Sequence, residues 1–206
     1  MKPTRVLIET IIITVITLAR MLFIPSAKLL FALLPVAYLL IERRLRKRTW
    51  GDLGFKVRTF WTDLRASWIL FIFLGFIIQP ATALWAKTYF PEFLNHVQAR
   101  LPFENGMSWG ILLPLLAVSL IGEEMTYRTL IQGRLAQFIG TPAGIVVASL
   151  LFGLAHYAPG PGIVVFTDVG LIIVSSVLYG VLFARRNNLW VVWLAHLSGD
   201  IFGLII

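Results

Sequence analysis

The chain has no cysteine among its 206 residues, so disulfide bonds, thiol nucleophiles and cysteine-ligated metal sites are excluded. Charged residues are also scarce, at 14% of the chain, whereas a soluble domain carries about 25%. Hydrophobic residues reach 58%, above the about 45–50% that is usual for a soluble domain. This composition predicts a polytopic integral membrane protein.

Acidic residues are few: ten Asp and Glu stand against eighteen Lys and Arg, which gives a net charge of +8. A basic chain can bind nucleic acid, but most basic residues here lie in short connections beside apolar runs, as the positive-inside rule requires. The strongest basic clusters are residues 42–48 and 185–186. We therefore predict a cytoplasmic N-terminus, contact with the lipid bilayer and no nucleic-acid partner. The predicted location is a bacterial plasma (inner) membrane.

Internal repeats, low-complexity segments and a soluble domain are also missing. Apolar runs fill the chain instead, and about 20 helical residues suffice to cross a bilayer. The candidate spans are residues 6–24, 29–41, 66–86, 109–139, 143–157, 163–184 and 189–206. The sequence thus predicts an all-α bundle of about seven transmembrane helices. We assign residues 1–108 to N-terminal transmembrane helices with their connecting loops, and residues 109–206 to a C-terminal helix bundle.

Two segments fit this pattern less well. The run 29–41 is short, and it reaches spanning length only if Lys28 extends its ammonium group to the membrane surface. Residues 87–107 are of mixed polarity, so we place them outside the membrane and expect His96 to be a surface residue of a loop.

Three short polar pieces lie within the apolar C-terminal runs. They are Glu123-Glu124, then His156, then His196 with Asp200. Ionisable groups at membrane depth cost free energy and usually mark a working site that faces the protein interior. We therefore predict that the three pieces form one site inside the bundle.

Helical geometry supports this convergence. If residues 109–139 and 143–157 form an antiparallel hairpin that turns at Gly140, the depths of Glu123 and His156 differ by only about 3 Å, at about 1.5 Å per residue. His196 would lie shallower, unless the hairpin protrudes about 10 Å into the cytoplasm. Such a protrusion would put the site in the cytoplasmic half of the membrane.

Spacing along the helices also separates the roles of the carboxylates. Glu124 and Arg128 are four residues apart, so we expect Arg128 to neutralise and orient Glu124 in a supporting role. Glu123 points about 100° away from Glu124 and can act chemically. His196 and Asp200 are also four residues apart, so both can face one cavity.

These residues suit two chemistries. In the first, Glu123 is a general base that activates water with help from His156, while His196 and Asp200 stabilise an oxyanion. In the second, Glu123, His156 and His196 bind a catalytic zinc ion. We rank zinc second, because the His-Glu-x-x-His signature of metalloproteases is missing. A third possibility is that these polar residues only fix helix packing.

The motifs resemble a known family. Glu-Glu-x-x-x-Arg, Phe-x-x-x-His and His-x-x-x-Asn/Asp occur in this order in the CPBP (ABI) family of CAAX-processing and bacteriocin-processing intramembrane proteases, and the resemblance covers about residues 109–206. It implies a glutamic endopeptidase without an obligatory cofactor, although an older metal-dependent reading of the family keeps zinc as an alternative. The matching residues are Glu123, Glu124, Arg128, Phe152, His156, His196 and Asp200.

The resemblance also suggests what each matched residue does. It implies that Glu123 and His156 activate water, whereas His196 and Asp200 stabilise the oxyanion. Prenyl-protein proteases carry Asn at the last position, and Asp donates a hydrogen bond only when protonated. Asp200 can instead orient and charge His196.

We therefore expect an intramembrane protease that cleaves a membrane-associated protein or peptide near the cytoplasmic face. The alternatives are a catalytically silent scaffold or immunity protein of the same fold and a small transporter with a proton relay. The absence of a sequence repeat argues against the transporter.

Overall fold

A computed structural model describes residues 3–23, 28–100 and 107–205, and within these ranges the chain is helical and contains no strand. The α-helices are α1 (Pro3–Phe23), α2 (Lys28–Leu45), α3 (Phe60–Ala66), α4 (Trp68–Ile72), α5 (Gln79–Tyr89), α6 (Pro91–Arg100), α7 (Trp109–Glu124), α8 (Gly133–Ile139), α9 (Thr141–Ala155), α10 (Gly162–Arg186) and α11 (Leu189–Ile205). Two π-helical segments, η4 (Phe73–Ile78) and η5 (Met125–Gln132), continue α4 into α5 and α7 into α8. The predicted all-α bundle is confirmed.

Several of the described helices are long enough to cross a bilayer. In the described ranges, three continuous helices are long and apolar enough to cross a membrane: Trp68–Tyr89, Trp109–Ile139 and Gly162–Arg186. Helices α9 and α11 are apolar but shorter. At about 1.5 Å per residue, the 21 residues of α1 and the 18 of α2 also approach the about 30 Å of a bilayer core.

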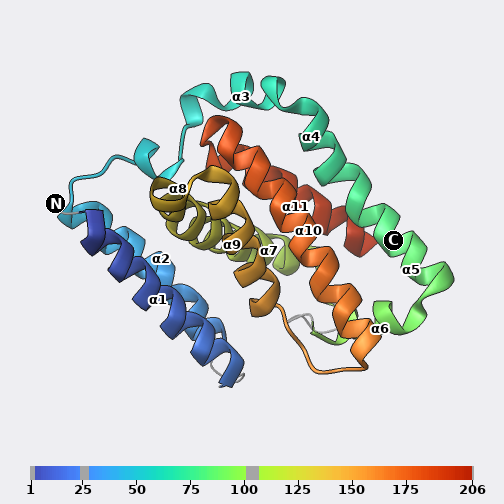
Figure 1. Ribbon diagram of the computed structural model, residues 1–206. Coiled ribbons are helices and arrows are strands. Elements are labelled where there is room, and N and C mark those ends of the chain that lie inside the picture. Colours follow the sequence, from blue (N-terminus) through green and yellow to red (C-terminus); the bar gives the residue numbers. More distant parts are fainter. Residues whose placement is uncertain (1–2, 24–27, 101–106, 206) are drawn as a thin grey trace.

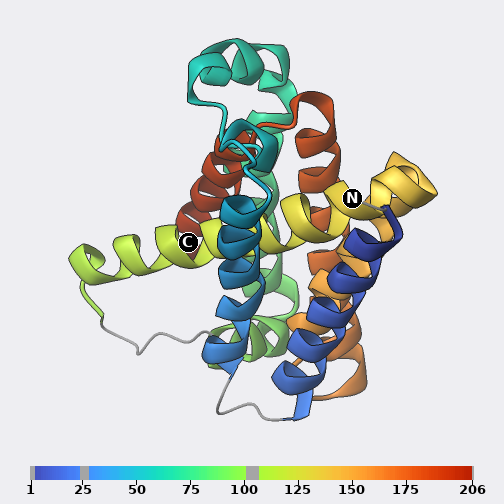
Figure 2. The same ribbon diagram turned by 90° about the vertical axis from the view of Figure 1, so that its left-hand side faces the viewer.

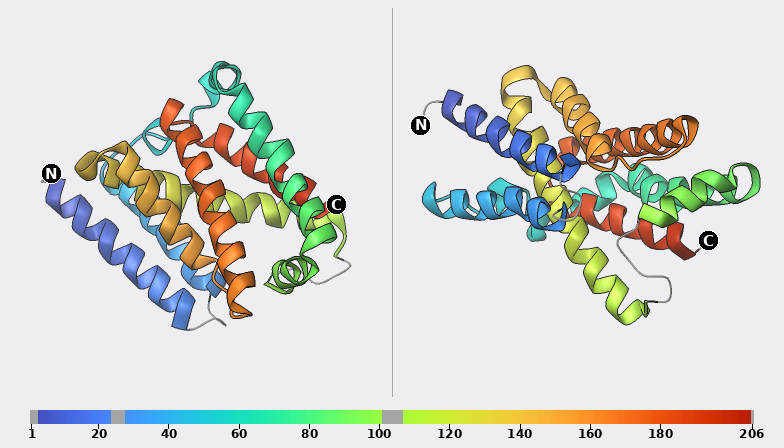
Figure 3. Two further views of the ribbon diagram at one scale, coloured as in Figure 1. Left: turned by 45° about the vertical axis from the view of Figure 1, so that its right-hand side comes forward. Right: turned by 90° about the horizontal axis from the view of Figure 1, so that it is seen from below.

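Helices α7, α8 and α9 lie between the N-terminal pair α1 and α2 and the helices α5, α10 and α11 (Figure 1). Seen from below, α1 and α2 lie on one side, and α5, α10 and α11 lie on the other (Figure 3). Figure 2 shows α7 running across α1 and α2 at a steep angle. The predicted hairpin therefore forms only where η5 and α8 pack against α9, whereas α7 diverges from it. The sequence could not reveal this, because the crossing angle of two helices depends on tertiary packing.

The connection between α2 and α3 meets the connection between α10 and α11 at one end of the bundle. Each connection adjoins one of the basic clusters, 42–48 and 185–186. The Lys56 ammonium donates a hydrogen bond to the carbonyl of Arg186 over 3.3 Å, and the Asn188 amide donates one to the Lys56 carbonyl over 3.0 Å. The backbone N–H of Leu189 donates to the Gly54 carbonyl over 2.7 Å. Both connections thus lie on one side of the molecule, as the predicted seven-span topology requires.

The connection that follows α2 packs against η5. Thr49 and Asp52 bond to each other reciprocally: the Thr49 N–H donates to Asp52 Oδ2 over 2.7 Å, and the Asp52 N–H donates to Thr49 Oγ1 over 3.2 Å. Hydrogen bonds with the backbone and side chain of Thr49 lower the pKa of the Asp52 carboxyl below its usual value. Next in the chain, Leu53 is fully buried, and its carbonyl accepts a 2.8 Å hydrogen bond from the Thr129 hydroxyl. The connection is therefore an ordered part of the bundle.

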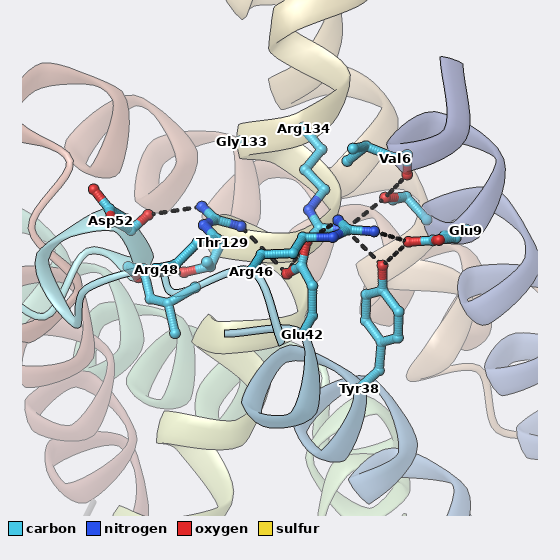
Figure 4. A network of polar contacts seen from close by, with 12 residues as sticks. Val6, Glu9, Tyr38, Glu42, Arg46, Arg48, Asp52, Thr129, Gly133 and Arg134 are labelled. Carbon is cyan, nitrogen blue, oxygen red and sulfur yellow. Dashed lines mark hydrogen bonds and ion pairs between the residues drawn. The ribbon is translucent and has the colours of Figure 1, made fainter. Parts of the chain in front are cut away.

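A buried polar network fastens α1 and α2 to α8 (Figure 4). The Tyr38 hydroxyl donates to Glu9 Oε2 over 2.7 Å and accepts from Arg134 over 3.1 Å. Glu42 forms ion pairs with both Arg134 and Arg46, and Arg46 also bonds to Glu9. Arg134 and Glu42 are almost inaccessible, at 3% and 4% exposure. Charges buried this deeply require such pairing, so the N-terminal hairpin is held to the helix that follows η5.

The expectation for His96 was wrong. His96 belongs to helix α6, and its side chain is 10% exposed and faces Asp168 of α10, with 3.5 Å between Nε2 and Oδ2. The physical reason is an apolar face on α6, where Phe93 packs in a cluster with Val164 of α10. This packing turns a segment of mixed polarity into a helix that covers the bundle.

Candidate active site

A buried ion pair lies where α7 passes into the π-helical segment η5. Arg128 Nε donates to Glu124 Oε2 over 3.0 Å, so the predicted pair forms. Both residues are inaccessible, with 0% exposure for Arg128 and 1% for Glu124. Arg128 Nη2 also donates to the Ser176 hydroxyl of α10 over 3.1 Å. π-helical segments occur frequently at functional sites, and this one holds its arginine against two neighbouring elements.

His196 of α11 lies between two carboxylates. Its Nδ1 is 2.8 Å from Glu124 Oε1, and its Nε2 is 3.8 Å from Asp200 Oδ1. The imidazole ring also stacks on the ring of Tyr179, with centroids 4.7 Å apart and planes 28° apart. The short contact fixes Nδ1 as the atom that faces Glu124. The contact to Asp200 is longer than a hydrogen bond.

His156 lies at the C-terminal cap of α9, next to Phe152 of the same motif. Its Nδ1–H donates to the carbonyl of Phe152 over 2.8 Å, because a carbonyl oxygen can only accept. This bond selects the neutral tautomer in which Nε2 carries the lone pair. The Phe152 ring lies 4.4 Å from the His156 ring and 6.1 Å from the His196 ring, centroid to centroid. Phe152 therefore joins the second and third motifs.

The site has a buried layer and a more accessible layer. Glu124, Arg128 and His196 are buried, whereas Glu123, His156 and Asp200 are only partly covered. Glu123 is the sequence neighbour of Glu124, whose Oε1 lies 2.8 Å from His196 Nδ1. The three motifs are thus brought together, and the more exposed side chains of the site are those of Glu123, His156 and Asp200.

Comparison with known families adds one finding. The model of the family described as type II CAAX prenyl endopeptidase Rce1-like matches residues 105–202. The match covers slightly less than half of the chain. The predicted resemblance to CAAX-processing membrane proteases is thereby confirmed. No curated protein and no solved structure matches the chain.

The apolar helices establish the broad class of the protein. Within the described ranges, three helices are long and apolar enough to cross a bilayer, so the chain is an integral membrane protein. Its residues 105–202 are similar to a family of membrane proteases. The matched segment contains all three motifs from which the site is built.

Three further residues contact the candidate site, and the sequence motifs did not indicate them. Ser176 bonds to Arg128, Tyr179 stacks on His196, and Gln79 Nε2 donates to Asp200 Oδ1 over 3.4 Å. Ser176 and Gln79 each place a polar side chain within an apolar run, and this was the one sequence feature that could have indicated them as site residues. Tyr179 gave none, because an aromatic residue in a span is normally core.

The zinc alternative requires several ligating side chains close to one another. Across the residues that the structure describes, no group of three or more His, Asp or Glu side chains is clustered closely enough to hold a metal ion. Zinc binding by Glu123, His156 and His196 stays a prediction, which metal removal can test.

Proposed function

We propose that this Rce1-like protein is a glutamic endopeptidase in which Glu123 and His156 activate water. The observation that carries the proposal is the difference between the two adjacent carboxylates. Glu124 is inaccessible and is bonded to Arg128 and His196, so it is committed to structure. Glu123 is partly accessible at the same level of the bundle, as a general base must be.

In the proposed reaction, the Glu123 carboxylate takes a proton from a water molecule while the water oxygen attacks the carbonyl carbon of the peptide bond. The carbonyl π electrons move to oxygen and give a tetrahedral oxyanion. Collapse of this intermediate breaks the C–N bond, and the proton held by Glu123 passes to the leaving nitrogen. His156 assists by accepting a hydrogen bond from the water at Nε2, the atom that the Nδ1–H bond to Phe152 leaves with the lone pair.

His196 is the proposed donor to the oxyanion. Its Nδ1 is held by Glu124, and its Nε2 is 3.8 Å from Asp200, so an Nε2–H has room to turn toward a substrate oxygen. Asp200 then charges and orients His196. We prefer this role to donation by Asp200, which would need a protonated carboxyl.

The partial exposure of Glu123 and His156 favours a protease over a silent scaffold or immunity protein, because residues that only fix packing need no access to water. Basic residues are concentrated at the end of the bundle where the connections 46–59 and 187–188 meet. By the positive-inside rule, this placement favours a cytoplasmic site and a cytoplasmic N-terminus. We propose a bacterial plasma membrane as the location, with residues 1–108 supporting a catalytic bundle in 109–206.

The proposal can be tested with purified full-length protein in lipid vesicles. A panel of single-span peptides, with and without a prenylated C-terminal cysteine, is incubated with the natural protein and with Glu123→Gln. Mass spectrometry should find fragments cut at a defined bond only with the natural protein. If no peptide is cut, or if both forms cut equally, the proposal fails.

Metal removal should leave the activity unchanged. Because the proposed water activation uses only Glu123 and His156, dialysis of the purified protein against a chelator is expected to preserve kcat. A zinc enzyme would lose kcat on dialysis and regain it when Zn²⁺ is added. The metal content of the active protein, measured by elemental analysis, gives an independent reading. Loss of activity that Zn²⁺ alone restores would replace the glutamic mechanism with the zinc mechanism.

A further inference from the structure

Gln79 reaches the candidate active site from outside the segment that matches the family. It is the first residue of α5, directly after the π-helical segment η4, and the family match begins only at residue 105. Its amide Nε2 donates to Asp200 Oδ1 over 3.4 Å, across 121 residues of sequence. A span of the N-terminal region therefore contacts a motif residue directly.

The fit between these two spans depends on small residues of α11. A Cβ atom at Gly199 would lie 2.9 Å from the Leu74 carbonyl oxygen and 3.3 Å from Gln79 Cγ. A Cβ atom at Gly203 would lie 3.3 Å from Gln79 Cβ. Gly199 and Gly203 have the small-x-x-x-small spacing that allows close approach of membrane helices. The stem of Gln79 therefore lies along this glycine face, with its amide directed at Asp200.

The chemistry of the contact assigns a role to Asp200. An amide N–H can only donate, so Asp200 Oδ1 accepts from Gln79. The same oxygen faces His196 Nε2 at 3.8 Å. A carboxylate that accepts from Gln79 is ionised, so at 3.8 Å it stabilises a positive charge on His196 through its own charge, and it does not donate to an oxyanion.

We infer that Gln79 is a positioning residue that holds Asp200, as a hydrogen-bond acceptor, beside Nε2 of His196. The inference rests on the proposed function, since it concerns how His196 comes to face the oxyanion. It adds that the Rce1-like segment does not complete its own site. The third span supplies the group that fixes the acid at position 200.

Exchange of donor and acceptor tests this inference. Gln79→Glu puts a second carboxylate beside Asp200, so kcat is expected to fall about tenfold with little change in KM. In the Gln79→Glu/Asp200→Asn double variant, the amide and the carboxylate have changed places, and a donor–acceptor pair is restored. The double variant should therefore reach the kcat of Asp200→Asn alone, to within about threefold.

The controls separate positioning from packing. Gln79→Leu keeps the volume but removes the donor, so it should also lower kcat with KM unchanged. It replaces Gln79→Glu in the test if that variant does not insert into the membrane. Gln137→Glu alters an exposed glutamine whose amide donates to the Gly133 carbonyl oxygen of its own helix, and it should leave kcat unchanged. Thermal unfolding of every variant monitors folding.

Two results would overturn the inference. In the first, Gln79→Glu lowers kcat by the same factor in the natural protein and in the Asp200→Asn variant, which would mean that the two side chains act independently. In the second, folded Gln79→Leu keeps the natural kcat. Failure of the proposed function is recognised separately, because the natural protein itself would then cleave no substrate.

Discussion

Changing Glu123 to glutamine is expected to lower kcat for peptide cleavage by about 100- to 10,000-fold, the usual contribution of a general base. The amide has nearly the same shape as the carboxylate, but it cannot take a proton from water. Glu123 is only partly covered at the end of α7, so the change should leave the unfolding temperature close to that of the natural protein. The measurement is single-turnover cleavage of a vesicle-embedded peptide, with unfolding followed in parallel.

The neighbouring carboxylate provides the matched control. Glu124→Gln weakens the buried contacts to Arg128 and His196, so it should lower the unfolding temperature as well as kcat. Only Glu123→Gln should separate activity from stability. A Glu123→Gln protein with full kcat, or one whose loss of kcat follows its loss of stability, would contradict the role given to Glu123.

Removal of the Arg128 charge should have the largest effect on stability. Arg128→Met is expected to destabilise the folded protein by about 3–5 kcal/mol, because it leaves a buried carboxylate without its cation. Arg128 is fully inaccessible, and it bonds to Glu124 and to Ser176 of α10. The free energy of unfolding can be measured by denaturant titration in mixed micelles.

Arg185→Met is the matched control, since Arg185 is exposed at the end of α10 and should change the free energy by at most about 0.5 kcal/mol. In Arg128→Met/Glu124→Leu, both charges are gone, and much of the lost stability should return. If Arg128→Met cost no more than Arg185→Met, the buried pair would not be a structural centre of the bundle.

The helical architecture was predictable because the bilayer restricts the chain so strongly. A backbone in hydrocarbon must satisfy its own hydrogen bonds, so each long apolar run has one available structure. The crossing of α7 and the two π-helical segments were not predictable, since both depend on contacts between helices. His96 was assigned wrongly for the same reason: a segment of mixed polarity becomes a buried helix only when α10 offers a surface for it.

The candidate site was predictable where its residues are close in sequence. The pairs Glu124–Arg128 and His196–Asp200 follow from a spacing of four on a helix. In the structure, the two side chains of each pair lie close to each other. The contact of His196 with Glu124 spans 72 residues, and that of Gln79 with Asp200 spans 121. No local spacing encodes such contacts, so they emerge only from the packed bundle.

The most direct test of the central claim compares the membrane proteomes of cells that produce the natural protein and the Glu123→Gln form at equal abundance. The account predicts a new peptide terminus, in or beside a transmembrane segment, that is present only with the natural protein. That terminus would establish proteolysis and identify the substrate. Equal membrane levels of both forms without any such terminus would contradict the protease account and favour a scaffold.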